Sequence, residues 1–159
     1  MENPNIQFLL SQLRATFDRQ PWYGDSVMKK LREVPHEAVM AVPQGLANSV
    51  AKLVRHMIVW REYALAKIGG DAALTIVLST PEDWPPVSVQ TAQDWDALLQ
   101  RLVQSQTDLL DALASKTDAW LLTPVPGKPQ EPFRELLEGI IHHDLYHLGQ
   151  IVLVAKLTN

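Results

Sequence analysis

The sequence predicts an all-α fold, a four-helix bundle, and two observations carry that prediction. The first is the placement of proline, because its ring is excluded from helix interiors. The eleven prolines leave five proline-free spans, which are 5–20, 22–34, 44–80, 87–123 and 133–159. The second is that apolar residues in these spans recur every three or four positions instead of alternating, as in amphipathic helices. With 159 residues and no convincing strand pattern, the chain is expected to form one domain over 1–159.

The first half of the chain is expected to hold two long helices and a short one. The first long helix carries its apolar side chains on one face: Ile6, Leu9, Leu10, Leu13 and Phe17. A short helix is expected around Ser26 to Val34. The second long helix begins after Asn48 or Ser49, either of which can cap it, and Gly69-Gly70 would end it through a left-handed turn.

The second half is expected to hold the other two long helices. Thr91 is the predicted N-cap of the third, and Pro132 fits the first turn of the fourth, which continues to the C-terminus. The connection 69–90 between the second and third helices is too long for a structureless loop in a compact domain. We therefore expect it to be ordered and to cover one end of the bundle.

Composition excludes several classes of function. The chain has no cysteine, which rules out a disulfide framework, a cysteine-ligated metal site and a thiol nucleophile of its own. A net charge of −4 without a long basic run argues against nucleic-acid binding. No run of 18 uncharged apolar residues and no secretory leader are found, so the sequence predicts a cytoplasmic protein without a membrane partner.

Three of the five histidines fall close together, at His142, His143 and His147. On a helix, residues four apart are rotated by only about 40°, so the imidazoles of His143 and His147 can reach one ion. His142 is rotated by about 100° from His143 and cannot easily share that ion, although it could support the site from outside. The pair alone is weak evidence, because two partly buried and hydrogen-bonded histidines would show the same spacing.

His56 strengthens the case. It lies mid-helix among core-forming residues, so three inward histidines on two helices predict a three-histidine metal site. A zinc protease is disfavoured because Asp144 stands where the HExxH motif has glutamate, and the repeated Glu-x-x-His of di-iron bundles is missing. Gln150 could orient a ligand, and Tyr146 and Trp60 could shape a pocket. Ordinary bundle packing would explain each of these three equally well.

The motifs together resemble the DinB/YfiT-like superfamily of small four-helix-bundle proteins, over nearly the whole chain. The resemblance is carried by His56 on the second long helix and by His143-x-x-x-His147-x-Gly149-Gln150 on the last. The further matching segments are Trp22-Tyr23-Gly24, Asn48-Ser49, Trp60, Trp84-Pro85-Pro86 and the helix start from Thr91 to Trp95.

The resemblance implies that His56, His143 and His147 bind a divalent metal, with zinc or nickel the expected ion and water at open positions. It further implies a metal-dependent enzyme, related to thiol S-transferases that use low-molecular-weight thiols or to isomerases and hydrolases. It also implies a homodimer and a link to stress response. Many members carry arginine after the last histidine, whereas this chain has Leu148, so any anion contact made by that arginine would be missing here.

The leading hypothesis is therefore a metal-dependent enzyme acting on a small molecule. Three neutral histidines leave open positions on an ion, which can activate a bound thiol or water. Because the chain has no cysteine, a thiol would have to arrive as a cosubstrate. Two alternatives stay open: a non-catalytic metal-binding or stress-response protein with a structural metal, and a site that has lost its metal.

Overall fold

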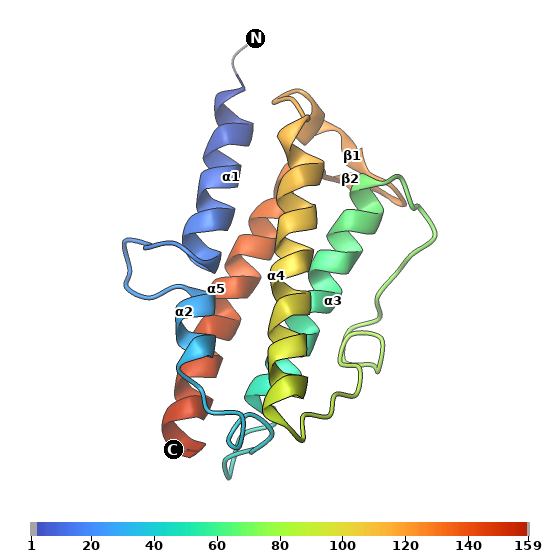
Figure 1. Cartoon of the computed structure of the whole chain (residues 1–159). Coiled ribbons are helices and arrows are strands. Elements are labelled where there is room, and N and C mark those ends of the chain that lie inside the picture. Colours follow the sequence, from blue (N-terminus) through green and yellow to red (C-terminus); the bar gives the residue numbers. More distant parts are fainter. Residues whose placement is uncertain (1–2, 159) are drawn as a thin grey trace.

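The computed structural model describes residues 3–158 and shows a bundle of four long helices (Figure 1). The long helices are α1 (Pro4–Phe17), α3 (Val50–Ile68), α4 (Ala92–Ala114) and α5 (Phe133–Thr158), and the short α2 (Val27–Arg32) continues the line of α1. The all-α prediction is confirmed. No helix within the described residues has the length and apolar composition needed to cross a membrane.

Local sequence signals set the helix ends. The Ser49 side chain accepts a hydrogen bond from the Lys52 backbone N–H and caps α3. Thr91 and Asp94 form a reciprocal capping box at the start of α4. Gly69 closes α3, and Gly70 follows with a φ of 96°, a left-handed value that glycine adopts without steric cost. These three ends agree with the sequence prediction.

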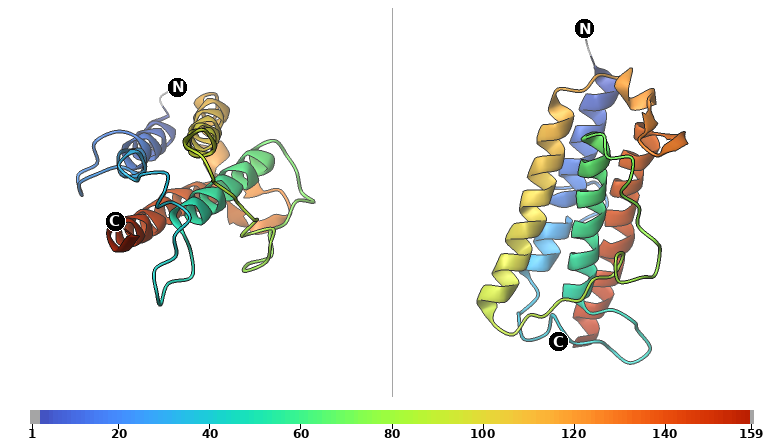
Figure 2. Two further views of the ribbon diagram at one scale, coloured as in Figure 1. Left: turned by 60° about the horizontal axis from the view of Figure 1, so that its bottom comes forward. Right: turned by 90° about the vertical axis from the view of Figure 1, so that its right-hand side faces the viewer.

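The connection between α3 and α4 lies along the side of the bundle, which corrects the expectation that it covers one end. Helices α3 and α4 run in the same direction, so the chain must return along the length of α3 before α4 can begin (Figures 1 and 2). Nineteen residues of helix span about 28 Å, which explains why the connection is long. Its middle reaches the centre of α3, where the Asp83 backbone oxygen lies 2.8 Å from His56 Nδ1.

A small hairpin precedes α5, although no strand was expected from the sequence. Strands β1 (Pro124–Val125) and β2 (Lys128–Pro132) pair antiparallel around a turn at Gly127, whose φ is 81°. A Cβ added at Gly127 would lie 2.5 Å from the Ala72 carbonyl oxygen, so the hairpin packs closely on the long connection. Strands this short carry too few alternating residues to show a period of two, and Pro132 ends β2 instead of opening the helix.

A buried ion pair crosses the middle of the bundle. Arg61 on α3 donates from Nη2 to Oδ2 of Asp144 on α5, and both side chains are fully buried. The same guanidinium donates from Nε to Oε1 of Gln106 on α4, at 3.1 Å, and from Nη1 to the Met57 carbonyl. Gln106 in turn donates to the carbonyl of Leu13 on α1. This network ties all four long helices together, and it includes Met57 and Asp144, which directly follow His56 and His143 in the sequence.

Candidate metal centre

Three histidines from two helices meet at one point. His56 lies in the middle of α3, and His143 and His147 lie one turn apart on α5. The Nε2 atom of His143 is 2.9 Å from Nε2 of His56 and 3.0 Å from Nε2 of His147. One ligand atom from each ring falls within 4.8 Å of the others, so the three imidazoles could hold one ion. Crossing of α3 and α5 at this level is what brings residues 87 positions apart into contact.

Acceptors on the outer side of two rings determine where their protons sit. His56 Nδ1 lies 2.8 Å from the backbone oxygen of Asp83 and 3.1 Å from its carboxylate Oδ1. His147 Nδ1 lies 2.6 Å from Oε1 of Gln150. Because both partners are acceptors, each Nδ1 carries the proton and donates it outward. The Nε2 lone pairs of His56 and His147 therefore point inward, at the same place.

This arrangement fits a metal better than it fits a hydrogen-bonded triad. A neutral His143 can donate one Nε2–H, and that proton cannot satisfy two lone pairs at once with good geometry. The other ring nitrogen of His143, Nδ1, is buried and has no hydrogen-bond partner among residues 3–158, so this ring meets the other two through Nε2 alone. A cation at the common point would accept a lone pair from each ring, and neutral imidazole suits zinc, nickel, copper and iron.

The environment keeps the three rings uncharged at neutral pH, the state in which imidazole binds a metal. Burial lowers the pKa of His143 to about 2, with repulsion from His147, His56 and Arg61 acting in the same direction. Burial also lowers the pKa of His147 to about 4, partly offset by its hydrogen bond to Gln150. The pKa of His56 is lowered by burial as well, against the opposing effect of Asp83.

Asp83 and Trp84, on the long connection, support His56. Asp83 was not identified from the sequence, and Trp84 was noted only as part of a segment that matches the family, without a role at the site. The Asp83 carboxylate also accepts hydrogen bonds from Trp60 Nε1 at 3.0 Å and from the Ser79 backbone N–H at 2.9 Å. The Trp84 ring stacks on the His56 ring, with centroids 3.7 Å apart and planes parallel. Asp83 carries no spacing signal toward the histidines, because it lies 27 residues from His56 in an irregular segment.

We predict that Asp83→Ala lowers metal affinity about tenfold. Partners that orient a metal-binding histidine typically contribute 10–100-fold to affinity, and the backbone oxygen of residue 83 would still hold Nδ1 of His56, which places the effect near the lower end. Competition with a chromogenic chelator measures the change. Glu82→Ala, in the same segment but exposed, is the matched control and should leave the affinity within about twofold of the wild type.

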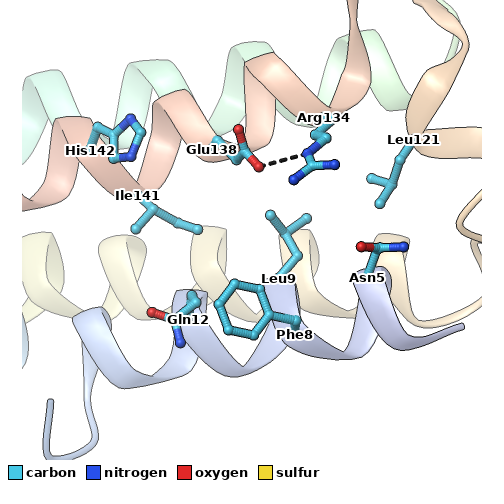
Figure 3. Close-up of a pocket in the computed structure, with 9 residues that line it drawn as sticks. All are labelled: Asn5, Phe8, Leu9, Gln12, Leu121, Arg134, Glu138, Ile141 and His142. Atoms are coloured by element: carbon cyan, nitrogen blue, oxygen red, sulfur yellow. Dashed lines mark hydrogen bonds and ion pairs between the residues drawn. The ribbon is translucent and has the colours of Figure 1, made fainter. Parts of the chain in front are cut away.

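The other residues singled out from the sequence lie at different distances from the centre. Gln150 holds His147, and Trp60 contacts the ring of His56 edge-on, with centroids 6.4 Å apart. Tyr146 packs edge-on against His147 at 5.0 Å but is 66% exposed. His142 is exposed and lines a groove between α1 and α5 (Figure 3).

Three hollows lie beside α5. One, of about 110 Å³, is lined by Gln150 near the C-terminal end of the helix, and the other two lie on different faces farther toward its N-terminal end. The groove in Figure 3 has a volume of about 200 Å³ and contains none of the three clustered histidines. The other hollow, of about 250 Å³, is lined by His143 and Trp60 and so adjoins the centre directly. A ligand reaching the three imidazoles through a cavity would therefore pass between α3 and α5.

Comparison with known proteins assigns the chain to a family. No curated protein matches it. A family model described as the DinB superfamily matches residues 24–151, which include all three clustered histidines, Asp83 and Gln150. This match covers most of the chain and agrees with the helical bundle and with the three-histidine group. The chain therefore belongs to the DinB superfamily.

Proposed function

We propose that the chain is a metal-dependent enzyme in which His56, His143 and His147 bind a divalent transition metal, zinc or nickel. The observation that supports this most strongly is the inward convergence of Nε2 lone pairs, imposed by Asp83 and Gln150 on the outer side of two rings. When bound, such an ion has open positions at which it lowers the pKa of a thiol or a water.

The chain's own residues orient the site and restrict water. Asp83 and Gln150 each hold a proton on Nδ1, which keeps both rings in the ligand tautomer. The Trp84 ring covers one face of His56, and His56 and His147 are only 4% and 3% exposed. The approach left open runs past His143 and Trp60, so a small-molecule substrate would meet the centre from that side.

The composition decides what the nucleophile can be. Because the chain has no cysteine, a thiol nucleophile has to be a low-molecular-weight cosubstrate, and water is the other choice. Leu148, in the place where many related chains have arginine, is buried in the core and offers no charge to an anionic substrate. We further propose that the protein acts as a cytoplasmic homodimer with a role in stress response, as the family resemblance implies.

A structural metal is the second candidate. Its support is that the ligands come from two helices and that two of the three are almost fully buried, so an ion would tie α3 to α5. In this case the ion would stabilise the fold without any turnover.

Metal content and turnover together test the proposal. Untagged protein should contain close to one equivalent of zinc or nickel by elemental analysis, or regain it on dialysis against either ion. The loaded protein should then transfer small thiols to electrophiles or hydrolyse activated esters, and protein stripped by a chelator should not. Stoichiometric metal without turnover across the panel would support the structural role. Less than about a tenth of an equivalent, not restored by added metal, would overturn both.

A further inference from the structure

We propose that the cavity beside the three histidines selects a substrate with a cationic group, held by Glu135 at the end farther from His143. The inference rests on the proposed function, since it takes the metal centre as the place where the reacting end of that substrate binds. It concerns the class of molecule that the centre accepts, which the family assignment leaves open.

The cavity runs along α5, away from the centre. Glu135, Gly139 and His143 follow one another at intervals of four residues, so they lie on one face of the helix. Eight residues of helix rise by about 12 Å, which is the separation between Glu135 and His143 along the axis. Both residues line the same cavity of about 250 Å³. A ligand in this cavity would therefore meet a carboxylate at one end and the metal centre at the other.

The walls between the two ends are apolar. Trp60 lines one side from α3, and Leu136 and Ile140 line the other from α5. Gly139 lies between them, and a Cβ placed there would meet no other atom within 4 Å, so the missing side chain leaves this stretch of the cavity open. Such walls suit a hydrocarbon spacer and offer no charge of their own.

The far end carries net negative charge. Glu131 and Glu135 both line it, and no lysine or arginine does. Lys128 is close, but it pairs with Glu131 at 2.9 Å. The next basic residue on α5, Arg134, pairs with Glu138 in the groove on the opposite face (Figure 3). Glu135 is exposed at this end of the cavity and forms no ion pair within residues 3–158, so a cationic group could reach it by displacing solvent alone.

These features describe a ligand of definite chemistry. One end is a nucleophile or donor that binds the metal, the middle is a short apolar chain, and the other end is an ammonium or guanidinium group. An anionic thiol would be disfavoured, because its carboxylate would face Glu135 at an end of the cavity that no lysine or arginine lines.

Three thiols of equal length test this class. Aminooctanethiol, mercaptooctanol and mercaptooctanoate differ only in the charge of the far end, and binding of each to cobalt-loaded protein is followed by its thiolate-to-cobalt absorption band. We expect aminooctanethiol to bind about tenfold more tightly than mercaptooctanoate. Attraction between the ammonium group and Glu135, and repulsion between the carboxylate and Glu135, each contribute a few-fold. High salt should reduce this preference.

The matched variants locate the effect. Glu135→Gln should bring the three dissociation constants within about twofold of one another, whereas Glu138→Gln, on the same helix but in the opposite groove, should keep the preference. An unchanged preference in Glu135→Gln, or a wild-type preference for the carboxylate, would overturn the inference while the metal site stands. Failure of the wild type to bind cobalt would overturn the proposed function, and the inference with it.

Discussion

Replacing His143 with alanine is expected to lower the affinity for zinc or nickel at least about 100-fold. The Nε2 atom of His143 lies within 3.0 Å of Nε2 of both His56 and His147. Without it, only two histidine ligands remain for the ion. Four-ligand zinc sites bind with about 10–16 kcal/mol, which makes one ligand worth roughly 3 kcal/mol, or about 100-fold. Isothermal titration of the chelator-stripped protein measures the loss.

His142→Ala is the control for this experiment. It removes an imidazole from the adjacent position of the same helix, but from the side that faces α1 (Figure 3). The control should bind metal as the wild type does. His143→Gln should show the same loss as His143→Ala, and circular dichroism of both variants establishes that the bundle is intact. Equal affinities for His142→Ala and His143→Ala would contradict the ligand assignment.

Arg61→Met is expected to destabilise the fold by about 3–5 kcal/mol, the usual cost of leaving a buried charge without its partner. The variant leaves Asp144 fully buried, and Oδ1 of this carboxylate already lacks a hydrogen-bond partner among the described residues. It also removes the donor that Gln106 uses to join α4 to the network. Urea unfolding at pH 7 measures the free-energy change. Arg101→Met, which breaks an exposed pair with Glu62, should cost no more than about 1 kcal/mol.

The pH dependence of the Arg61→Met defect provides an independent check. Burial already raises the pKa of Asp144, and the loss of the arginine removes the attraction that opposes this rise. A carboxyl whose pKa is raised by folding destabilises the folded state above that pKa and ceases to do so once it is protonated. The stability gap between wild type and variant should therefore narrow as the pH falls. A gap that is constant or widens toward low pH would show that the buried charge is not its cause.

Most of the fold could be predicted from local sequence. Ser49, Thr91 and Gly69-Gly70 act within a turn or two of their own positions, so they mark the ends of α3 and α4 before any tertiary contact is known. The course of the long connection could not be predicted in this way. It depends on α3 and α4 running in the same direction, and helix periodicity carries no information about direction.

The candidate site also has residues that local sequence predicts and residues that only tertiary contacts bring to it. His143 and His147 share a helix, so their spacing alone predicts that they face one ion, and His56 stands out because it is polar in an apolar stretch. Asp83 carries no such signal, and Trp84 belongs to a segment that matches the family but gives no indication that it contacts His56. They reach His56 only because the connection returns along the side of α3, and this contact forms between segments that no periodic pattern relates.

By itself, the sequence determined the all-α class, the helix ends and the three histidines, because each depends on backbone preference or on spacing within one helix. The tertiary structure decided which nitrogen of His56 and of His147 faces the centre and which hollow adjoins it. These outcomes follow from how α3, α5 and the long connection cross in space. Hydrogen-bond geometry and cavity shape arise only from that crossing.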